Sequence, residues 1–87
     1  TIIAGISTPN ISKWSIYPNP ASFQFTIDLS AENGKYYIHD LNGRLIVQDF
    51  IHGTAFVDVS QFINGVYIVS VEYENGSFSR DKIVIQH

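Results

Sequence analysis

Four Asn-Gly pairs divide this 87-residue chain into short segments. Asn and Gly both tolerate positive φ, which a type I′ turn needs at both central positions, so such pairs are typical of hairpins and tight turns. Between the pairs, apolar and polar residues alternate with a period of two, and no segment has a convincing helical period. The sequence therefore predicts an all-β fold. The pairs are Asn33-Gly34, Asn42-Gly43, Asn64-Gly65 and Asn75-Gly76.

The alternation predicts seven strands. The clearest covers residues 23–29, where Phe23, Phe25, Ile27 and Leu29 alternate with polar residues. Two hairpins are expected around residues 42–43 and 75–76, and residues 60–63 are expected to cross between sheets with one helical turn. The apolar residues of the last strand change phase near residues 80–82, which predicts a bulge or an irregularity of the sheet edge. The other strands are residues 11–17, 35–41, 44–50, 55–59, 66–74 and 78–86.

Seven short antiparallel strands without helices predict an immunoglobulin-like β-sandwich. The chain has no cysteine, so the Cys–Trp–Cys arrangement of a true antibody-type domain is excluded. In residues 66–74, one face carries Tyr67, Val69, Val71 and Tyr73, and we expect this face to be buried.

The segment Tyr17-Pro18-Asn19-Pro20-Ala21 constrains the fold in a second way. Each proline lacks a backbone N–H and pushes the preceding residue toward extended geometry. Such a segment runs extended but cannot pair inside a sheet, so it suits a crossover at a sheet edge. We therefore assign Pro18 and Pro20 to shaping the fold.

Composition narrows the function classes. The length allows one small domain, and 45% hydrophobic, 14% aromatic and 15% charged residues are typical of a globular module. The net charge of −3 and five scattered cationic residues argue against nucleic-acid binding, which needs clustered Lys and Arg. Without cysteine, a disulfide framework and a Cys-type zinc site are excluded. No apolar run reaches the roughly 20 residues of a membrane span, so no membrane insertion is expected.

The first ten residues carry turn formers and are typical of a linker from an upstream domain, with residues 11–87 as the folded domain. Ile2, Ile3 and Ile6 would also allow a short edge strand there. The chain begins with Thr1 and has no signal peptide, so we expect it to be a fragment whose targeting segment lies upstream. Removal of an initiator methionine is the alternative.

Serine, histidine and carboxylate residues are present, but their settings do not predict a nucleophilic triad. His39 and Asp40 are neighbours in an expected strand and should point to opposite faces, while His52 lies in an expected loop and His87 is the last residue. No Gly-x-Ser-x-Gly elbow occurs. The chain is not expected to be an enzyme, and no catalytic residue is predicted.

Carboxylate pairs do not predict a site either. Glu72 and Glu74 lie about 7 Å apart on one strand face, which suits a solubilising edge better than an acid–base pair. Residues 40–43 resemble the start of a calcium loop, but the later ligands are missing and a hairpin turn explains them better. No metal or cofactor site is predicted.

Aromatic residues leave one binding function open. Exposed planar side chains on a β-sandwich can stack on sugar rings, and this favours a carbohydrate-binding or fibronectin-like accessory module of a secreted enzyme as an alternative. A lone tryptophan in a small β domain is, however, more often part of the core. The candidate platform is Trp14, Tyr36, Tyr37, Phe50 and Tyr73.

Four motifs occur in a fixed order. They are SIYPNPA at residues 15–21, YIHDLNGR at 37–44, VDVS at 57–60 leading into NGVYIV at 64–69, and KIVI at 82–85. Together they resemble the type A C-terminal sorting domain of proteins that Bacteroidetes export by the type IX secretion system. Each motif alone is weak, but the order and the gaps make a specific signal over residues 13–87.

The resemblance implies that the domain is a sorting signal and has no active site. In this family the cargo first enters the periplasm with an N-terminal signal peptide, and the outer-membrane translocon and its shuttle then read the domain. A sortase-like peptidase often removes it upstream of the sandwich. The cargo is then released outside the cell or joined to anionic lipopolysaccharide at the outer membrane surface.

The family positions fall into a structural group and a recognition group. In the structural group, Gly65 is expected to supply positive φ at a strand entrance, and the hydroxyl of Tyr67 to bond across the crossover. In the recognition group, Lys82 offers a charge, and the edge of the last strand is expected to offer unpaired N–H and C=O groups to the translocon. The structural positions are Pro18, Asn19, Pro20, Asp40, Gly43, Gly65 and Tyr67, and the recognition positions are Lys82, Ile83, Val84 and Ile85.

Overall fold

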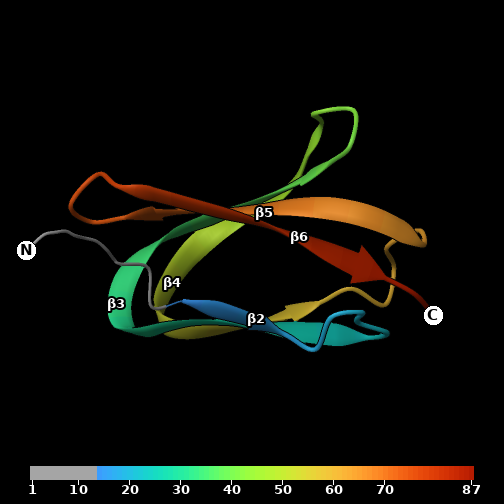
Figure 1. Ribbon diagram of the computed structural model, residues 1–87, viewed down its shortest axis with the longest axis horizontal. Coiled ribbons are helices and arrows are strands. Elements are labelled where there is room, and N and C mark those ends of the chain that lie inside the picture. Colours follow the sequence, from blue (N-terminus) through green and yellow to red (C-terminus); the bar gives the residue numbers. More distant parts are fainter. Residues whose placement is uncertain (1–13) are drawn as a thin grey trace, which may run out of the picture.

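The computed structural model describes residues 14–87, which form a five-stranded antiparallel sheet (Figure 1). β3 is central, since it pairs with β2 and β5 along one edge and with β4 along the other. β6 pairs with β5. The linker expected at residues 1–10, with its possible edge strand, lies outside the described residues, as does the start of the strand expected at 11–17. The strands are β2 (Ser15–Tyr17), β3 (Gln24–Asp40), β4 (Leu45–Asp58), β5 (Gly65–Tyr73) and β6 (Phe78–Ile85).

The prediction of seven strands is wrong because two pairs of expected strands are continuous. Residues 23–29 and 35–41 fall largely within β3, and residues 44–50 and 55–59 within β4. The chain bends there instead of reversing. Residues 29–32 of β3 lie opposite Gly53 of β4, and this bulge contains Ser30 and Ala31 at φ 54° and 74°. The immunoglobulin-like sandwich is therefore not confirmed, although the all-β class is.

The bends fold the sheet over on itself. In Figure 1, β2 and the start of β3 lie below the core, while β5 and β6 lie above it. One buried cluster fills the space between the two halves, and both contribute to it because β3 runs through both. Its members are Ala21, Phe25, Ile27, Leu29, Tyr36, Ile38, Ile51, Val57, Val59, Tyr67, Val69, Val71, Ile83 and Ile85.

The period of two predicted the buried faces well. Phe25, Ile27 and Leu29 are buried as expected. The assignment of Phe23 to the same face is wrong, because Phe23 precedes β3 and is exposed. Tyr67, Val69 and Val71 are also buried, and Tyr73 packs against the core.

The expected bulge in the last strand is wrong. The pairing of β6 with β5 runs without interruption from Phe78 opposite Glu72 to Ile85 opposite Gly65. The apparent change of phase arises because Phe78 is exposed near the hairpin end, so only Ile83 and Ile85 reach the core.

Two of the four Asn-Gly pairs form the predicted hairpin turns. Gly43 and Gly76 have φ of 86° and 89°, and their N–H groups donate to the carbonyls of Asp40 (3.0 Å) and Tyr73 (2.9 Å). Asn33-Gly34 lies inside β3, and Asn64-Gly65 leads into β5. Residues 60–63 form a turn rather than a helical turn, with the Phe62 N–H donating to the Val59 carbonyl (3.0 Å).

Candidate functional site: the C-terminal strand and its clamp

The outer edge of the C-terminal half of β6 is covered by residues 19–22, which we call the clamp. Ala21 forms an isolated parallel bridge with Ile85. The Ala21 N–H donates to the Val84 carbonyl, and the Gln86 N–H donates to the Ala21 carbonyl, both at 2.8 Å. One residue of the clamp thus pairs with β6 as a strand would.

The side chain of Asn19 continues this pairing. Its Nδ2 donates to the Lys82 carbonyl (3.1 Å), and its Oδ1 accepts from the Val84 N–H (3.0 Å). Ser22 Oγ donates to the Gln86 carbonyl at 3.0 Å. Pro18 and Pro20 offer no N–H groups, so the amide between them supplies a donor and an acceptor in their place.

The expectation of an unpaired edge along residues 82–85 is therefore wrong. The Lys82 N–H is also occupied, because it donates to its neighbour's carboxylate, Asp81 Oδ1, at 2.8 Å. Sequence reasoning gave the Pro-Asn-Pro motif a shaping role without a partner. The sequence did contain a signal for this pairing. An asparagine, whose amide can donate and accept, stands between two prolines that have no backbone N–H to donate.

Removing the Asn19 amide should loosen this edge. We expect Asn19→Ala to lower the free energy of unfolding by about 1–2 kcal/mol, because it removes two hydrogen bonds of modest net strength. Urea denaturation followed by circular dichroism measures the change. Asn19→Asp keeps the acceptor for Val84 but sets a carboxylate oxygen against the Lys82 carbonyl oxygen, so at neutral pH it should also be less stable than the wild type. A wild-type stability for Asn19→Ala would contradict the clamp.

The chain is held beyond β6 as well. The His87 N–H donates to Asn64 Oδ1 (3.0 Å), and His87 Nε2 lies 2.7 Å from the Phe62 carbonyl oxygen. The ring of Phe23 lies 6.0 Å from that of His87, centroid to centroid. Residues 82–87 are thus tied both to the clamp and to the crossover that precedes β5.

The four recognition positions differ in exposure. Ile83 and Ile85 belong to the core, and Val84 is half-buried. Lys82 is exposed. Only Lys82 therefore presents a charged group at the surface, and the isoleucines can act only through the position of the strand.

Asp40 organises the β3–β4 turn. Its Oδ1 accepts from the N–H groups of Asn42 and Arg44, both at 2.9 Å, and its Oδ2 lies 3.3 Å from Arg44 Nε. These contacts fix the chain on both sides of Gly43. The calcium-loop resemblance of residues 40–43 is thus explained by the turn.

The same hydrogen bonds make the turn sensitive to acid. The Arg44 N–H, followed by the Asn42 N–H and the Arg44 charge, holds the pKa of Asp40 below its usual range. A lowered folded-state pKa means that the stabilisation is complete above the unfolded-state pKa and is lost as the pH falls through the folded-state value. We expect the Arg44 amide resonance to titrate together with the Asp40 carboxyl in NMR. Asp40→Asn should remove that acidic transition, and its persistence would contradict the assignment.

Gly65 and Tyr67 connect the crossover to β5 as expected. Gly65 has φ 155°, and Tyr67 Oη donates to the Ile63 carbonyl at 2.6 Å. The Phe62 ring packs on that of Tyr67, with centroids 5.1 Å apart. These are structural roles, because Tyr67 is buried.

The aromatic residues do not form one platform. Tyr36 is buried in the core, whereas its neighbour Tyr37 faces the opposite side of β3. Trp14 and Tyr73 pack against the core, in agreement with the core interpretation of Trp14. Only Tyr37 and Phe50 face outward together, and Lys35 Nζ lies 5.5 Å from each ring centroid. The arrangement does not favour the sugar-binding alternative.

Residues 14–87 contain no group of three or more His, Asp and Glu side chains that could hold a metal ion. The described part of the chain also has no helix long and apolar enough to cross a bilayer. Glu72, one of the carboxylates considered for catalysis, accepts a hydrogen bond from the Tyr37 hydroxyl at 3.0 Å.

Comparison with known families identifies the domain, although no curated protein matches the chain. The family model described as the secretion system C-terminal sorting domain matches residues 15–86. The matched segment contains the clamp, the Asp40 turn, the Tyr67 crossover and β6 with Lys82. The chain therefore belongs to the family of C-terminal sorting domains of the type IX secretion system.

Proposed function

We propose that the type IX translocon and its shuttle read this domain as a folded unit, through Lys82 and the surface around it. As a member of its family, the domain is a type IX sorting signal that interacts with the secretion machinery and directs export across the outer membrane. The family is not one of enzymes. In our proposal the parent protein passes through the periplasm before the domain is read.

The observation that carries this proposal is the clamp. Hydrogen bonds from Asn19, Ala21 and Ser22 occupy the outer edge of residues 82–86, so a partner strand would have to displace them before pairing there. The Lys82 side chain needs no such displacement. We therefore assign direct contact with the translocon to Lys82. The role of Ile83, Val84 and Ile85 is to hold Lys82 in place.

Export of a fusion protein tests the proposal. A periplasmically targeted reporter carrying residues 1–87 should reach the medium of a type IX-competent host, and deletion of residues 82–87 should leave most of it in the cells. Because the deletion removes Ile83 and Ile85 from the core, it also lowers stability. Equal export with and without these residues would overturn the role of the last strand.

Lys82→Ala separates contact from folding. The Lys82 side chain is exposed, so the variant should melt like the wild type while exporting less reporter. Arg44→Ala removes an exposed cation from the β3–β4 turn and is the matched control, with export expected to remain near wild type. Normal export of a folded Lys82→Ala variant would exclude direct contact through this residue.

We further propose that a sortase-like peptidase cuts before β2, as the family resemblance implies. The measured mass of the exported reporter should then correspond to a chain without residues 14–87. An exported reporter that keeps these residues would contradict cleavage while leaving the sorting function intact.

A further inference from the structure

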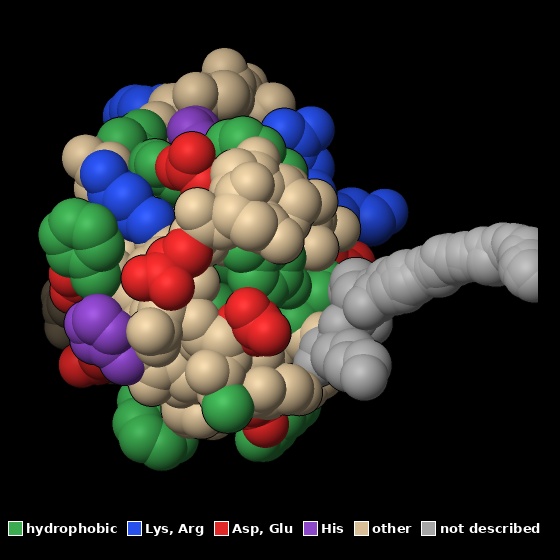
Figure 2. All heavy atoms as spheres, turned by 90° about the vertical axis from the view of Figure 1, so that its left-hand side faces the viewer, with side chains coloured by type: hydrophobic (Ala, Val, Ile, Leu, Met, Phe, Trp, Pro, Cys, Tyr) green, Lys and Arg blue, Asp and Glu red, His purple; other side chains and the backbone are tan. Residues whose placement is uncertain are grey.

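The side of the sheet that points away from the core around β5 and β6 collects positive charge, and we call it the outer face. Three of the five cationic residues of the sequence, Lys35, Arg80 and Lys82, lie on it, although the net charge of the chain is −3. Strand pairing aligns them with Glu72, Ser70 and Ile68, respectively. In the end-on view of Figure 2, the visible Lys and Arg side chains lie in the upper half, on the side of β5 and β6.

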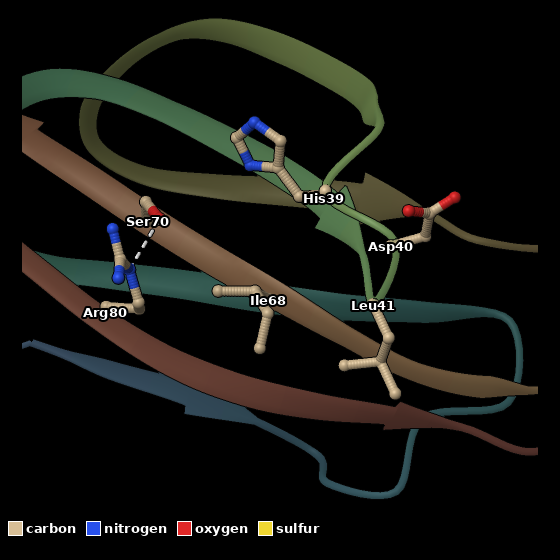
Figure 3. A pocket seen from close by; sticks show the side chains of 7 residues that line it. His39, Asp40, Leu41, Ile68, Ser70 and Arg80 are labelled. Carbon is tan, nitrogen blue, oxygen red and sulfur yellow. Dashed lines mark hydrogen bonds between the residues drawn. The ribbon is translucent and has the colours of Figure 1, made fainter.

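A depression of about 310 Å³ opens on this face (Figure 3). Arg80 lies at one side of it, and Arg80 Nε is 3.4 Å from Ser70 Oγ, whose residue is only 6% exposed. This weak bond orients the guanidinium. Among the hydrogen bonds found within residues 14–87, none involves the terminal nitrogens Nη1 and Nη2 of Arg80. The depression is lined by His39, Asp40, Leu41, Gly43, Ile68, Ser70 and Arg80.

The carboxylates nearby are already engaged. Asp40 pairs with Arg44, and its side chain points away from Arg80 in Figure 3. Glu72 accepts the hydrogen bond of Tyr37. Within residues 14–87 the ion pair found is that of Arg44 with Asp40, so Arg80 and Lys82 have no carboxylate partner there.

We propose that this depression binds a carboxylate side chain of an extended, acidic segment of a partner protein. A guanidinium matches a carboxylate with two parallel N–H···O bonds, and Arg80 has both terminal nitrogens available for them. Lys82 lies two residues further along β6, opposite Ile68 of β5. It adds a second positive charge for the next acidic residue of the partner segment.

Apolar neighbours favour a peptide over a phosphate-bearing glycan. Ile68 and Leu41 line the depression, and Leu41, Phe50 and Phe78 are exposed large apolar side chains. They can contact methylene and apolar groups of a peptide, which the phosphate groups of a lipopolysaccharide do not offer. The inference rests on the proposed function for its partner, which we take to be a component of the export machinery.

Binding to the purified 87-residue chain tests the site directly. The probe is a capped peptide of alternating Glu and Val, and the control is the same peptide with Gln in place of Glu. We expect the Glu peptide to cause saturable NMR shifts of the Arg80 Nε–H and the Ser70 and His39 amides, and the effect to weaken with added salt because exposed charges are screened. Saturation by the Gln peptide with equal affinity would overturn the proposal.

Two variants localise the contact. Arg80→Gln removes the charge and should weaken binding about tenfold, the value of one charge-assisted hydrogen bond. Arg44→Gln removes an arginine at the neighbouring turn that is already paired with Asp40, and should weaken binding clearly less than Arg80→Gln does. Equal losses in both variants would show that overall charge, not this depression, carries binding. Lipopolysaccharide that shifts the same resonances more strongly than the peptide would also overturn the assignment.

Export separates this inference from the proposed function. If wild-type reporter is exported but Arg80→Gln is exported equally well, the depression is not used by the machinery and the inference fails while the sorting function stands. If no fusion is exported, the proposed function fails, and peptide binding remains a separate result. We expect Arg80→Gln to lower both binding and export.

Discussion

Replacing Phe25 with alanine is expected to lower the free energy of unfolding by about 3–5 kcal/mol, the cost of emptying a buried aromatic site. Phe25 is 0% exposed and lies in the first half of β3, opposite Val57 of β4. A domain of this length has about 4–13 kcal/mol of stability in total, so the variant should lose a large part of it. Urea denaturation and thermal melting by circular dichroism measure the loss.

Phe56→Ala is the matched control for Phe25→Ala. Phe56 is the next residue along β4 from Val57, but it is 70% exposed on the other side of the sheet. Its removal should change the stability by only about 0.5 kcal/mol. Similar losses for the two variants would mean that the buried face has been assigned wrongly.

The same pair of variants tests whether the sorting signal is read in its folded form. Phe25 makes none of the hydrogen bonds of the clamp, yet Phe25→Ala should reduce export at temperatures where the domain melts, and export should recover at lower temperatures. Phe56→Ala should export normally at both. Full export of unfolded Phe25→Ala would show that the machinery reads an unfolded segment.

Gly34→Ala is expected to destabilise the domain by about 3 kcal/mol, the upper end of the usual cost of overpacking. A Cβ at this position would collide with the carbonyl oxygen of Glu72 and lie 3.2 Å from its carbonyl carbon and 3.3 Å from the Cα of Tyr73. These are backbone atoms of β5 and cannot rotate away. The added methyl would therefore push β3 and β5 apart where they pair.

Gly43→Ala separates this steric effect from backbone strain. Gly43 has φ 86°, but a Cβ there would meet nothing within 4 Å. Its replacement should cost about 1–2 kcal/mol, from the left-handed conformation alone. Urea denaturation of both variants gives the comparison, and hydrogen exchange at Lys35 and Glu72 reports the local separation of β3 from β5. A smaller loss for Gly34→Ala than for Gly43→Ala would contradict the close approach.

Gly34 also shows why the strand count could not be predicted. The dipeptides at residues 33–34 and 42–43 are identical, but only the second reverses the chain. At residue 34 glycine is required by the backbone of β5, which is almost forty residues away in the sequence. A local pattern carries no information about the strand that lies across from it, whereas the alternation that marks Phe25 and Ile27 as buried is local and could be interpreted correctly.

The candidate site was predicted in parts but not as an assembly. The sequence singled out the motifs containing Asn19 and Lys82, and the family resemblance supplied their function. The sequence did not predict that the two motifs lie side by side. The clamp lies outside the strands and pairs with β6 partly through the Asn19 amide side chain, which no strand pattern reveals. The depression beside Arg80 was missed for the same reason, since His39, Ser70 and Arg80 come from three different strands.

The hydrogen bonds of the clamp join positions that are 63 to 65 residues apart. Contacts of such long sequence separation close large loops, and domains rich in them fold slowly. The clamp can form only after β6 has docked on β5, because β6 is the strand that it covers. The surface around Lys82 therefore forms late in folding. Under our proposal that the machinery reads the folded domain, the folding rate limits how soon the parent protein can be exported.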